Sequence, residues 1–111
     1  MHKPHFLFVC SRNKWRSPTA ETIYANDDRI CVRSAGLSGK SPHQISEKDL
    51  AWADLVLVME QSHKSQLLKI FGKSSNMPKI EVLHIPDEYK YMDEELIEII
   101  RSEAECFIDG M

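Results

Sequence analysis

Four short, largely apolar runs alternate with segments of helical pattern, and this alternation constrains the fold more than any other feature. The runs are residues 6–9, 30–33, 55–59 and 80–83. The run LVLVM at 55–59 is apolar throughout, which is typical of a strand buried on both faces of a sheet. Strands that alternate with helices along a chain form a parallel sheet covered by helices. We therefore expect an α/β fold of three layers, with a four-stranded parallel sheet and helices on both faces.

Helix signals lie between the runs. Ser17 and Pro18 suit the N-cap and the first position of a helix that ends near residue 26. Capping and periodicity predict three more helices, one that opens at residue 46, one over 62–71 and one over 92–107. The residues SAG at 34–36 are typical of a loop.

Chain length limits the number of domains, and cysteine usage indicates the cellular compartment. The 111 residues suffice for one domain, which we expect to span 1–111. No apolar run approaches the ~20 residues of a membrane span, so we expect no membrane association. The three cysteines, Cys10, Cys31 and Cys106, are far apart in sequence. Such an odd number favours a reducing compartment and a cytoplasmic location, with Cys31 and Cys106 as small core residues.

Charge is distributed unevenly along the chain. The net charge is −3, whereas residues 87–109 alone carry −7 and residues 1–86 carry +4. An acidic protein of this kind is not expected to bind nucleic acid over its whole surface. The acidic segment is interpreted as the solvated face of the last helix.

The segment CSRNKWRS at residues 10–17 is the strongest candidate for a functional site. It joins the first expected strand to a helix N-terminus, where backbone N–H groups and the helix dipole favour an anion. Arg16 can bind two oxygens of a phosphate at once. The same positive field favours the thiolate of Cys10, and Ser17 could donate a hydrogen bond to it. The expected phosphate-binding residues are Ser11, Arg12, Asn13, Lys14, Trp15 and Arg16.

Residues 9–21, VCSRNKWRSPTAE, resemble the V-C-x-G-N-x-C-R-S-P-x-A-E loop of the low-molecular-weight protein tyrosine phosphatases. The segments RSAGLSG at 33–39, QISEKD at 44–49, DLVLVME at 54–60 and IPDEY at 85–89 also resemble family segments. The similarity is spread over nearly the whole chain. The chain is shorter than the usual member, mainly between residues 39 and 44.

The resemblance implies a site and a reaction. Cys10 would be the nucleophile, Arg16 the phosphate clamp and Ser17 the group that stabilises the thiolate. Asn13 and Ser38 would hold the loop's shape. Asp87 would be the general acid, with Glu88 as its local rival and Asp93 as a weaker one. The substrate would be a phosphorylated protein or a small aryl phosphate, and no metal or cofactor would be needed.

Departures from the family pattern concern the loop itself. Arg12 replaces the usual glycine, and Trp15 replaces the second loop cysteine. Non-glycine residues disfavour positive φ, so the backbone at Arg12 is expected to be regular or strained. The shortened segment after Gly39 is expected to give a more open pocket.

Two other functions are compatible with a phosphate loop. A phosphate-dependent binding module would bind without turnover. An arsenate reductase of the thioredoxin-coupled kind would need two more cysteines after the third strand, where this chain has MEQSH at 59–63. The sequence leaves the oligomeric state open.

Overall fold

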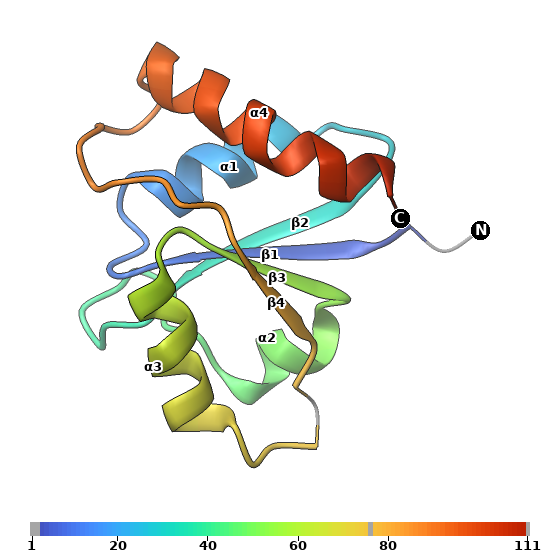
Figure 1. The fold of residues 1–111 in the computed structure, drawn as a ribbon, viewed down its shortest axis with the longest axis vertical. Helices are drawn as coiled ribbons and strands as arrows, with labels where there is room; N and C mark the ends of the chain where they lie inside the picture. Colours follow the sequence, from blue (N-terminus) through green and yellow to red (C-terminus); the bar gives the residue numbers. More distant parts are fainter. Residues whose placement is uncertain (1–2, 76, 111) are drawn as a thin grey trace.

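The computed structural model describes residues 3–75 and 77–110, and its four strands alternate with four helices along the chain (Figure 1). In chain order the elements are β1 (His5–Cys10), α1 (Arg16–Tyr24), β2 (Cys31–Gly36), α2 (Glu47–Trp52), β3 (Leu55–Val58), α3 (Gln61–Phe71), β4 (Lys79–Val82) and α4 (Glu94–Asp109). The expected alternation is confirmed.

The sheet is parallel throughout and has the strand order β2-β1-β3-β4. After β1 the chain forms β2 on one side of β1, and β3 is then added on the opposite side of β1. In such sheets ligands bind beyond the carboxyl ends of the strands, at the point where the strand order reverses. That point lies at the end of β1, where Cys10 leads into α1.

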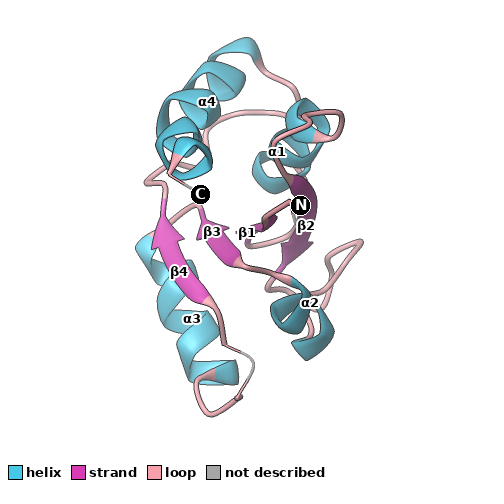
Figure 2. Cartoon of the chain, turned by 90° about the vertical axis from the view of Figure 1, so that its right-hand side faces the viewer, coloured by secondary structure: helices cyan, strands magenta, loops and turns pink. Residues whose placement is uncertain are grey.

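Helices cover both faces of the sheet, with α1 and α4 on one side and α2 and α3 on the other (Figures 1 and 2). Side chains of β1 alternate between the two cores. Phe6, Phe8 and Cys10 belong to one core, and Leu7 and Val9 belong to the other. Both faces of β1 are therefore buried, as a parallel strand between helical layers requires. The predicted three-layer α/β architecture is confirmed.

Three local predictions are wrong. Residues 34–36 are not a loop, because β2 continues to Gly36, which pairs with Cys10. Ser17 is not the N-cap of α1, because the helix already begins at Arg16 and Trp15 occupies the cap position. Cys106 is exposed and Cys31 is half-buried, so neither cysteine belongs to the buried core as expected. Pairing with β1 extends β2 to Gly36, and the Ser17 hydroxyl contacts Asn13 and Cys10 instead of capping the helix.

Gly36, at the end of β2, lies very close to the segment that follows Cys10. A Cβ at this position would lie 2.7 Å from the Cβ of Ser41 and 2.8 Å from the backbone nitrogen of Asn13. The absence of a side chain lets β2 and the β1–α1 segment approach closely. None of the described helices combines the length and apolar character needed to cross a membrane.

Candidate active site

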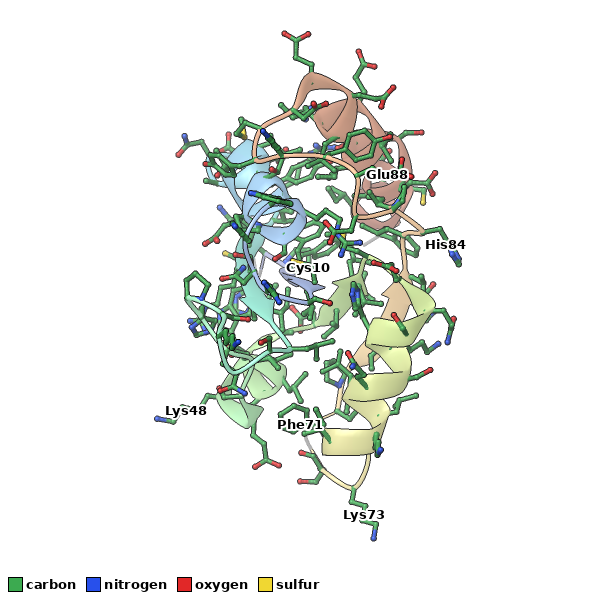
Figure 3. All side chains as sticks on the ribbon, turned by 90° about the vertical axis from the view of Figure 1, so that its left-hand side faces the viewer. Cys10, Lys48, Phe71, Lys73, His84 and Glu88 are labelled. Carbon is green, nitrogen blue, oxygen red and sulfur yellow. The ribbon has the colours of Figure 1, made fainter. Side chains whose placement is uncertain are left out.

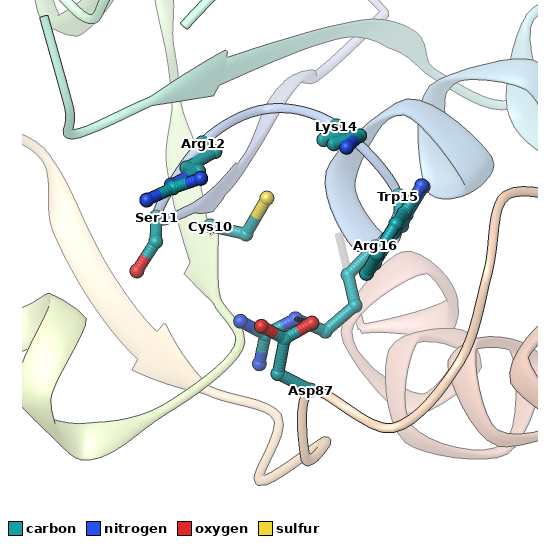
Figure 4. A pocket seen from close by; sticks show the side chains of 7 residues that line it. All are labelled: Cys10, Ser11, Arg12, Lys14, Trp15, Arg16 and Asp87. Atoms are coloured by element: carbon teal, nitrogen blue, oxygen red, sulfur yellow. Dashed lines mark ion pairs between the residues drawn. The ribbon is translucent and has the colours of Figure 1, made fainter. Parts of the chain in front are cut away.

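A pocket of about 310 Å³ opens where β1 gives way to α1. Figure 4 shows Cys10 at its centre, Ser11 and Arg12 to one side, Trp15 and Arg16 to the other, and Asp87 facing them. The lining residues are Cys10, Ser11, Arg12, Lys14, Trp15, Arg16 and Asp87. Six of these come from the predicted phosphate loop, and Asp87 comes from the segment after β4. The pocket therefore combines a thiol, cations and a carboxylate.

Cys10 is buried and lies beside Ser17. The Cys10 Sγ and the Ser17 Oγ are 3.0 Å apart. Asn13 Nδ2 donates to the same Ser17 oxygen at 3.0 Å, so the Ser17 proton is available for another acceptor. The Ala35 carbonyl is a more distant acceptor at 3.4 Å. The Ser17 hydroxyl thus lies within hydrogen-bond distance of the sulfur and can donate to a thiolate there.

The loop turns sharply at Asn13. Asn13 has a φ of 51°, and its Nδ2 donates to both Ser17 and Ser34 Oγ, the latter at 2.9 Å. Asparagine is one of the few residues that tolerate this conformation. Arg12 does not have a positive φ, so its replacement of the family's glycine leaves the backbone regular there. The strained position and its stabilising hydrogen bonds thus lie at Asn13.

Arg16 is 2% exposed and is fixed from behind the pocket. Its Nη1 donates to Glu60 Oε2 at 2.6 Å and to the Ile85 carbonyl at 2.8 Å. Both hydrogens of Nη1 are thereby engaged. Asp87 Oδ1 lies 3.6 Å from Nε on the opposite edge, which is formed by Nε and Nη2 and can bind two oxygens of an oxyanion. Arg16 also holds the pKa of the Glu60 carboxyl below its usual range, chiefly by this hydrogen bond.

Asp87 reaches the pocket through the extended segment after β4. The Leu83 and Ile85 N–H groups donate to the Val58 and Met59 carbonyls, each at 2.8 Å, so this segment continues beside β3. Asp87 Oδ1 then lies 3.6 Å from Arg16 Nε, while its side chain stays 56% exposed. A solvent-accessible carboxyl at the pocket rim can exchange protons with water. Glu88, its rival in the sequence, is exposed and does not line the pocket.

His63 is buried beneath the loop. Its Nδ1 accepts the Glu60 backbone N–H at 3.1 Å, so this nitrogen carries no proton. The Nε2–H therefore donates toward Ser11 Oγ at 3.3 Å. Burial, followed by the charge of Arg16, lowers the pKa of His63 below its usual value of 6.5. A neutral imidazole thus links the start of α3 to the phosphate loop.

The remaining predicted residues lie at the rim or behind it. Lys14 Nζ lies 4.8 Å from the centre of the Trp15 ring, and the half-buried indole lines the pocket. Ser38 contacts the loop through its backbone, whose N–H donates to the Ser11 carbonyl at 2.8 Å. The Ser38 side chain accepts instead from Lys40.

Sequence reasoning missed three residues that support the loop: Ser34, Glu60 and His63. Glu60 and His63 follow β3 immediately, at the carboxyl edge of the sheet, and this position could have identified them. Their partners in the loop are 44 and 52 residues away in sequence. Ser34 was missed because residues 34–36 were predicted to form a loop.

The other two cysteines are placed away from Cys10. Cys31 begins β2 and pairs with His5, at the end of the sheet opposite to the pocket, and Cys106 lies on α4. All three are free. A disulfide relay of the arsenate-reductase kind therefore has no partner thiol near Cys10 in the described residues. Nor do these residues contain a cluster of three or more His, Cys, Asp and Glu side chains suited to a metal ion.

Known tyrosine phosphatases resemble this chain in sequence. No family model matches the chain. The low molecular weight protein-tyrosine-phosphatase PtpB of Staphylococcus epidermidis is 30% identical, over 64% of this chain and 67% of its own length. The chain belongs to the low-molecular-weight protein tyrosine phosphatase family.

Solved structures of this family share the fold over almost the whole chain. The low molecular weight protein tyrosine phosphatase of Streptococcus pyogenes superimposes with a TM-score of 0.79 at 19% identity, covering 97% of this chain and 93% of that one. The YwlE arginine phosphatase of Geobacillus stearothermophilus superimposes with a TM-score of 0.65 at 25% identity, covering 96% and 88%. The family resemblance of the sequence is thus confirmed.

Proposed function

We propose that this low-molecular-weight phosphatase hydrolyses phosphomonoesters, of phosphotyrosine or a similar aryl phosphate, through a cysteinyl-phosphate intermediate. The observation that carries the proposal is the meeting of three groups in one pocket. Cys10, Arg16 and Asp87 all line the same pocket, where the Asp87 carboxyl faces the Arg16 guanidinium (Figure 4). These are the nucleophile, the anion clamp and the proton donor that this reaction needs.

In the first step the Cys10 thiolate attacks phosphorus and the bond to the ester oxygen breaks. Asp87 gives its proton to that oxygen, so the product leaves as a neutral phenol. Arg16 binds two equatorial oxygens through Nε and Nη2, and the N-terminus of α1 stabilises their charge. The Ser17 hydroxyl, 3.0 Å from the sulfur, stabilises the thiolate before attack.

In the second step water attacks the cysteinyl-phosphate. Asp87, now a carboxylate, accepts a proton from that water, and the sulfur–phosphorus bond breaks. Inorganic phosphate leaves and the Cys10 thiolate is restored. Both steps use side chains of this chain alone, and we expect activity in the presence of EDTA.

The substrate class is inferred from the pocket and from relatives. The relative from Staphylococcus epidermidis and the structure from Streptococcus pyogenes are named protein tyrosine phosphatases, whereas YwlE is named an arginine phosphatase. The half-buried Trp15 on the pocket wall favours an aromatic ring. Because YwlE is named an arginine phosphatase, phosphoarginine is the second substrate class to assay. The three free cysteines support a cytoplasmic location.

The deciding experiment measures hydrolysis of para-nitrophenyl phosphate in mildly acidic buffer with EDTA. We expect turnover by the wild type, inhibition by vanadate and loss of turnover in Cys10→Ser. Wild-type protein that is folded and binds phosphate, but turns over neither this ester nor phosphoarginine, would instead be a binding module. Turnover that survives in Cys10→Ser would exclude the cysteinyl-phosphate route.

A further inference from the structure

A second pocket, of about 390 Å³, adjoins the phosphate pocket on the side of α3. Ser11 lines both pockets, so they meet at the phosphate loop. The second pocket is lined by Ser11, Leu37, Ser38, Gln66, Lys69 and Ile70. We call it the flanking pocket. It lies beside the reacting centre and contains none of the proposed catalytic groups.

Both walls of the flanking pocket are attached to the phosphate loop. One wall is the turn after β2, where the Leu37 and Ser38 N–H groups donate to the Cys10 and Ser11 carbonyls at 3.1 and 2.8 Å. The other wall is α3, which His63 joins to Ser11. The position of the flanking pocket relative to a bound phosphate is therefore fixed by the fold.

The flanking pocket offers an apolar surface beside a cation. Leu37 is half-buried against the core, and Ile70 is 59% exposed. Lys69 is exposed on the same helix. An apolar ligand side chain and an adjacent carboxylate would match these two features.

The charge around the flanking pocket is opposite in sign to that of the whole chain. Lys69 lines the flanking pocket, and helix α3 has no acidic residue within Gln61–Phe71. Arg12 and Lys14 add exposed cations at the neighbouring pocket. Of the described residues that line either pocket, Asp87 alone is acidic. In a protein of net charge −3, this local excess of cations favours an acidic ligand.

We propose that the flanking pocket binds the substrate polypeptide next to its phosphorylated residue. An apolar side chain of the substrate packs against Leu37 and Ile70, and a neighbouring carboxylate pairs with Lys69. The inference rests on the proposed function, which places the phosphorylated side chain in the first pocket. A small aryl phosphate fills that pocket without reaching α3, whereas a polypeptide continues beyond it. The enzyme would therefore prefer phosphopeptides with acidic and apolar residues beside the phosphorylated one.

The test uses binding rather than turnover. Two fluorescent peptides carry phosphonodifluoromethyl-phenylalanine, which cannot be hydrolysed, flanked on both sides by leucine and by either glutamate or glutamine. For the wild type we expect the glutamate peptide to bind about threefold to fivefold more tightly, as for a partly exposed ion pair. Lys69→Glu should reverse this preference. Ile70→Ser should weaken the binding of both leucine-containing peptides. The loss of affinity should be smaller for matching peptides in which alanine replaces leucine.

The matched control is Lys48→Glu. Lys48 is exposed on α2 and lies away from Cys10 in Figure 3, so this variant makes the same charge change outside both pockets. It should keep the wild-type preference. Since the ratio of two affinities is read, a general loss of binding or folding cancels.

Three outcomes would overturn the inference. They are equal affinity of the wild type for the two peptides, a glutamate preference that survives Lys69→Glu, and no binding of either peptide. Failure of the proposed function is recognised separately, as the absence of para-nitrophenyl phosphate turnover. The binding ratio can still be measured in that case, because it needs no catalysis.

Discussion

Glu60 Oε2 accepts a 2.6 Å hydrogen bond from Arg16 Nη1. The two residues are 44 positions apart in sequence, and the contact joins the N-cap of α3 to the start of α1. It engages Nη1 on the side away from Asp87, so that the Nε–Nη2 edge is turned toward Asp87 and the pocket. Glu60 is therefore a positioning residue for the phosphate clamp, and it acts through Arg16 rather than by touching substrate.

Glu60→Gln should lower kcat/KM for para-nitrophenyl phosphate by about 10-fold, since small misplacements of a binding group cost up to about 10²-fold. The inhibition constant of inorganic phosphate should rise in parallel, because Arg16 loses its orientation. Glu98→Gln, at an exposed position of α4, is the control and should behave as wild type. An unchanged phosphate inhibition constant in Glu60→Gln would contradict the positioning role.

Asp87→Asn should reduce kcat for phenyl phosphate by about 10²-fold or more, because general acid catalysis contributes about 10²–10⁴-fold. The reduction should be smaller for para-nitrophenyl phosphate, whose leaving group needs little protonation. Glu88→Gln is the matched control, since Glu88 does not line the pocket. Equal losses in the two variants would mean that the loop as a whole, and not the Asp87 carboxyl, is responsible.

Ser17→Ala should slow the reaction of Cys10 with iodoacetamide at neutral pH and lower kcat by about 10-fold, the effect of losing one hydrogen bond to a charged group. The physical reason is that the Ser17 hydroxyl lies 3.0 Å from the sulfur and stabilises the thiolate. Ser102→Ala, at an exposed position of α4, controls for removing a hydroxyl group. If Ser17→Ala alkylates at the wild-type rate, the hydroxyl has a purely structural role.

His63 should make the protein less stable as the pH falls. Burial lowers the pKa of His63, so the unfolded chain binds this proton more readily than the folded protein. The contribution of His63 to stability is then complete above the ordinary value of 6.5 and is lost progressively below it. Between about pH 7 and pH 5 the free energy of unfolding should fall less in His63→Gln than in wild type.

The matched control for that measurement is His84→Asn. His84 is exposed and has a φ of 57°, which asparagine tolerates. The pH dependence of its unfolding free energy should parallel that of the wild type. Parallel curves for wild type and His63→Gln would show that His63 does not titrate differently on folding.

The sequence alone predicted the architecture and most of the loop that forms the pocket, because these depend on local order along the chain. Apolar runs separated by helical patterns admit few folds other than a parallel sheet between helices. Cys10, Arg16 and Ser17 lie within one short connection, so their proximity follows from the chain itself. Asp87 was predicted as the general acid from the family resemblance and from its place in the polar loop after the last strand, and it lies 3.6 Å from Arg16.

Tertiary structure alone decided which residues stand behind the loop. Glu60 and His63 reach Arg16 and Ser11 because the carboxyl ends of β1 and β3 are neighbours in the sheet, a fact set by strand order. The extension of β2 to Gly36 depends likewise on pairing with Cys10. The flanking pocket needs both α3 and the turn after β2 in place. Local patterns specify elements, whereas contacts between residues distant in sequence follow from how those elements pack.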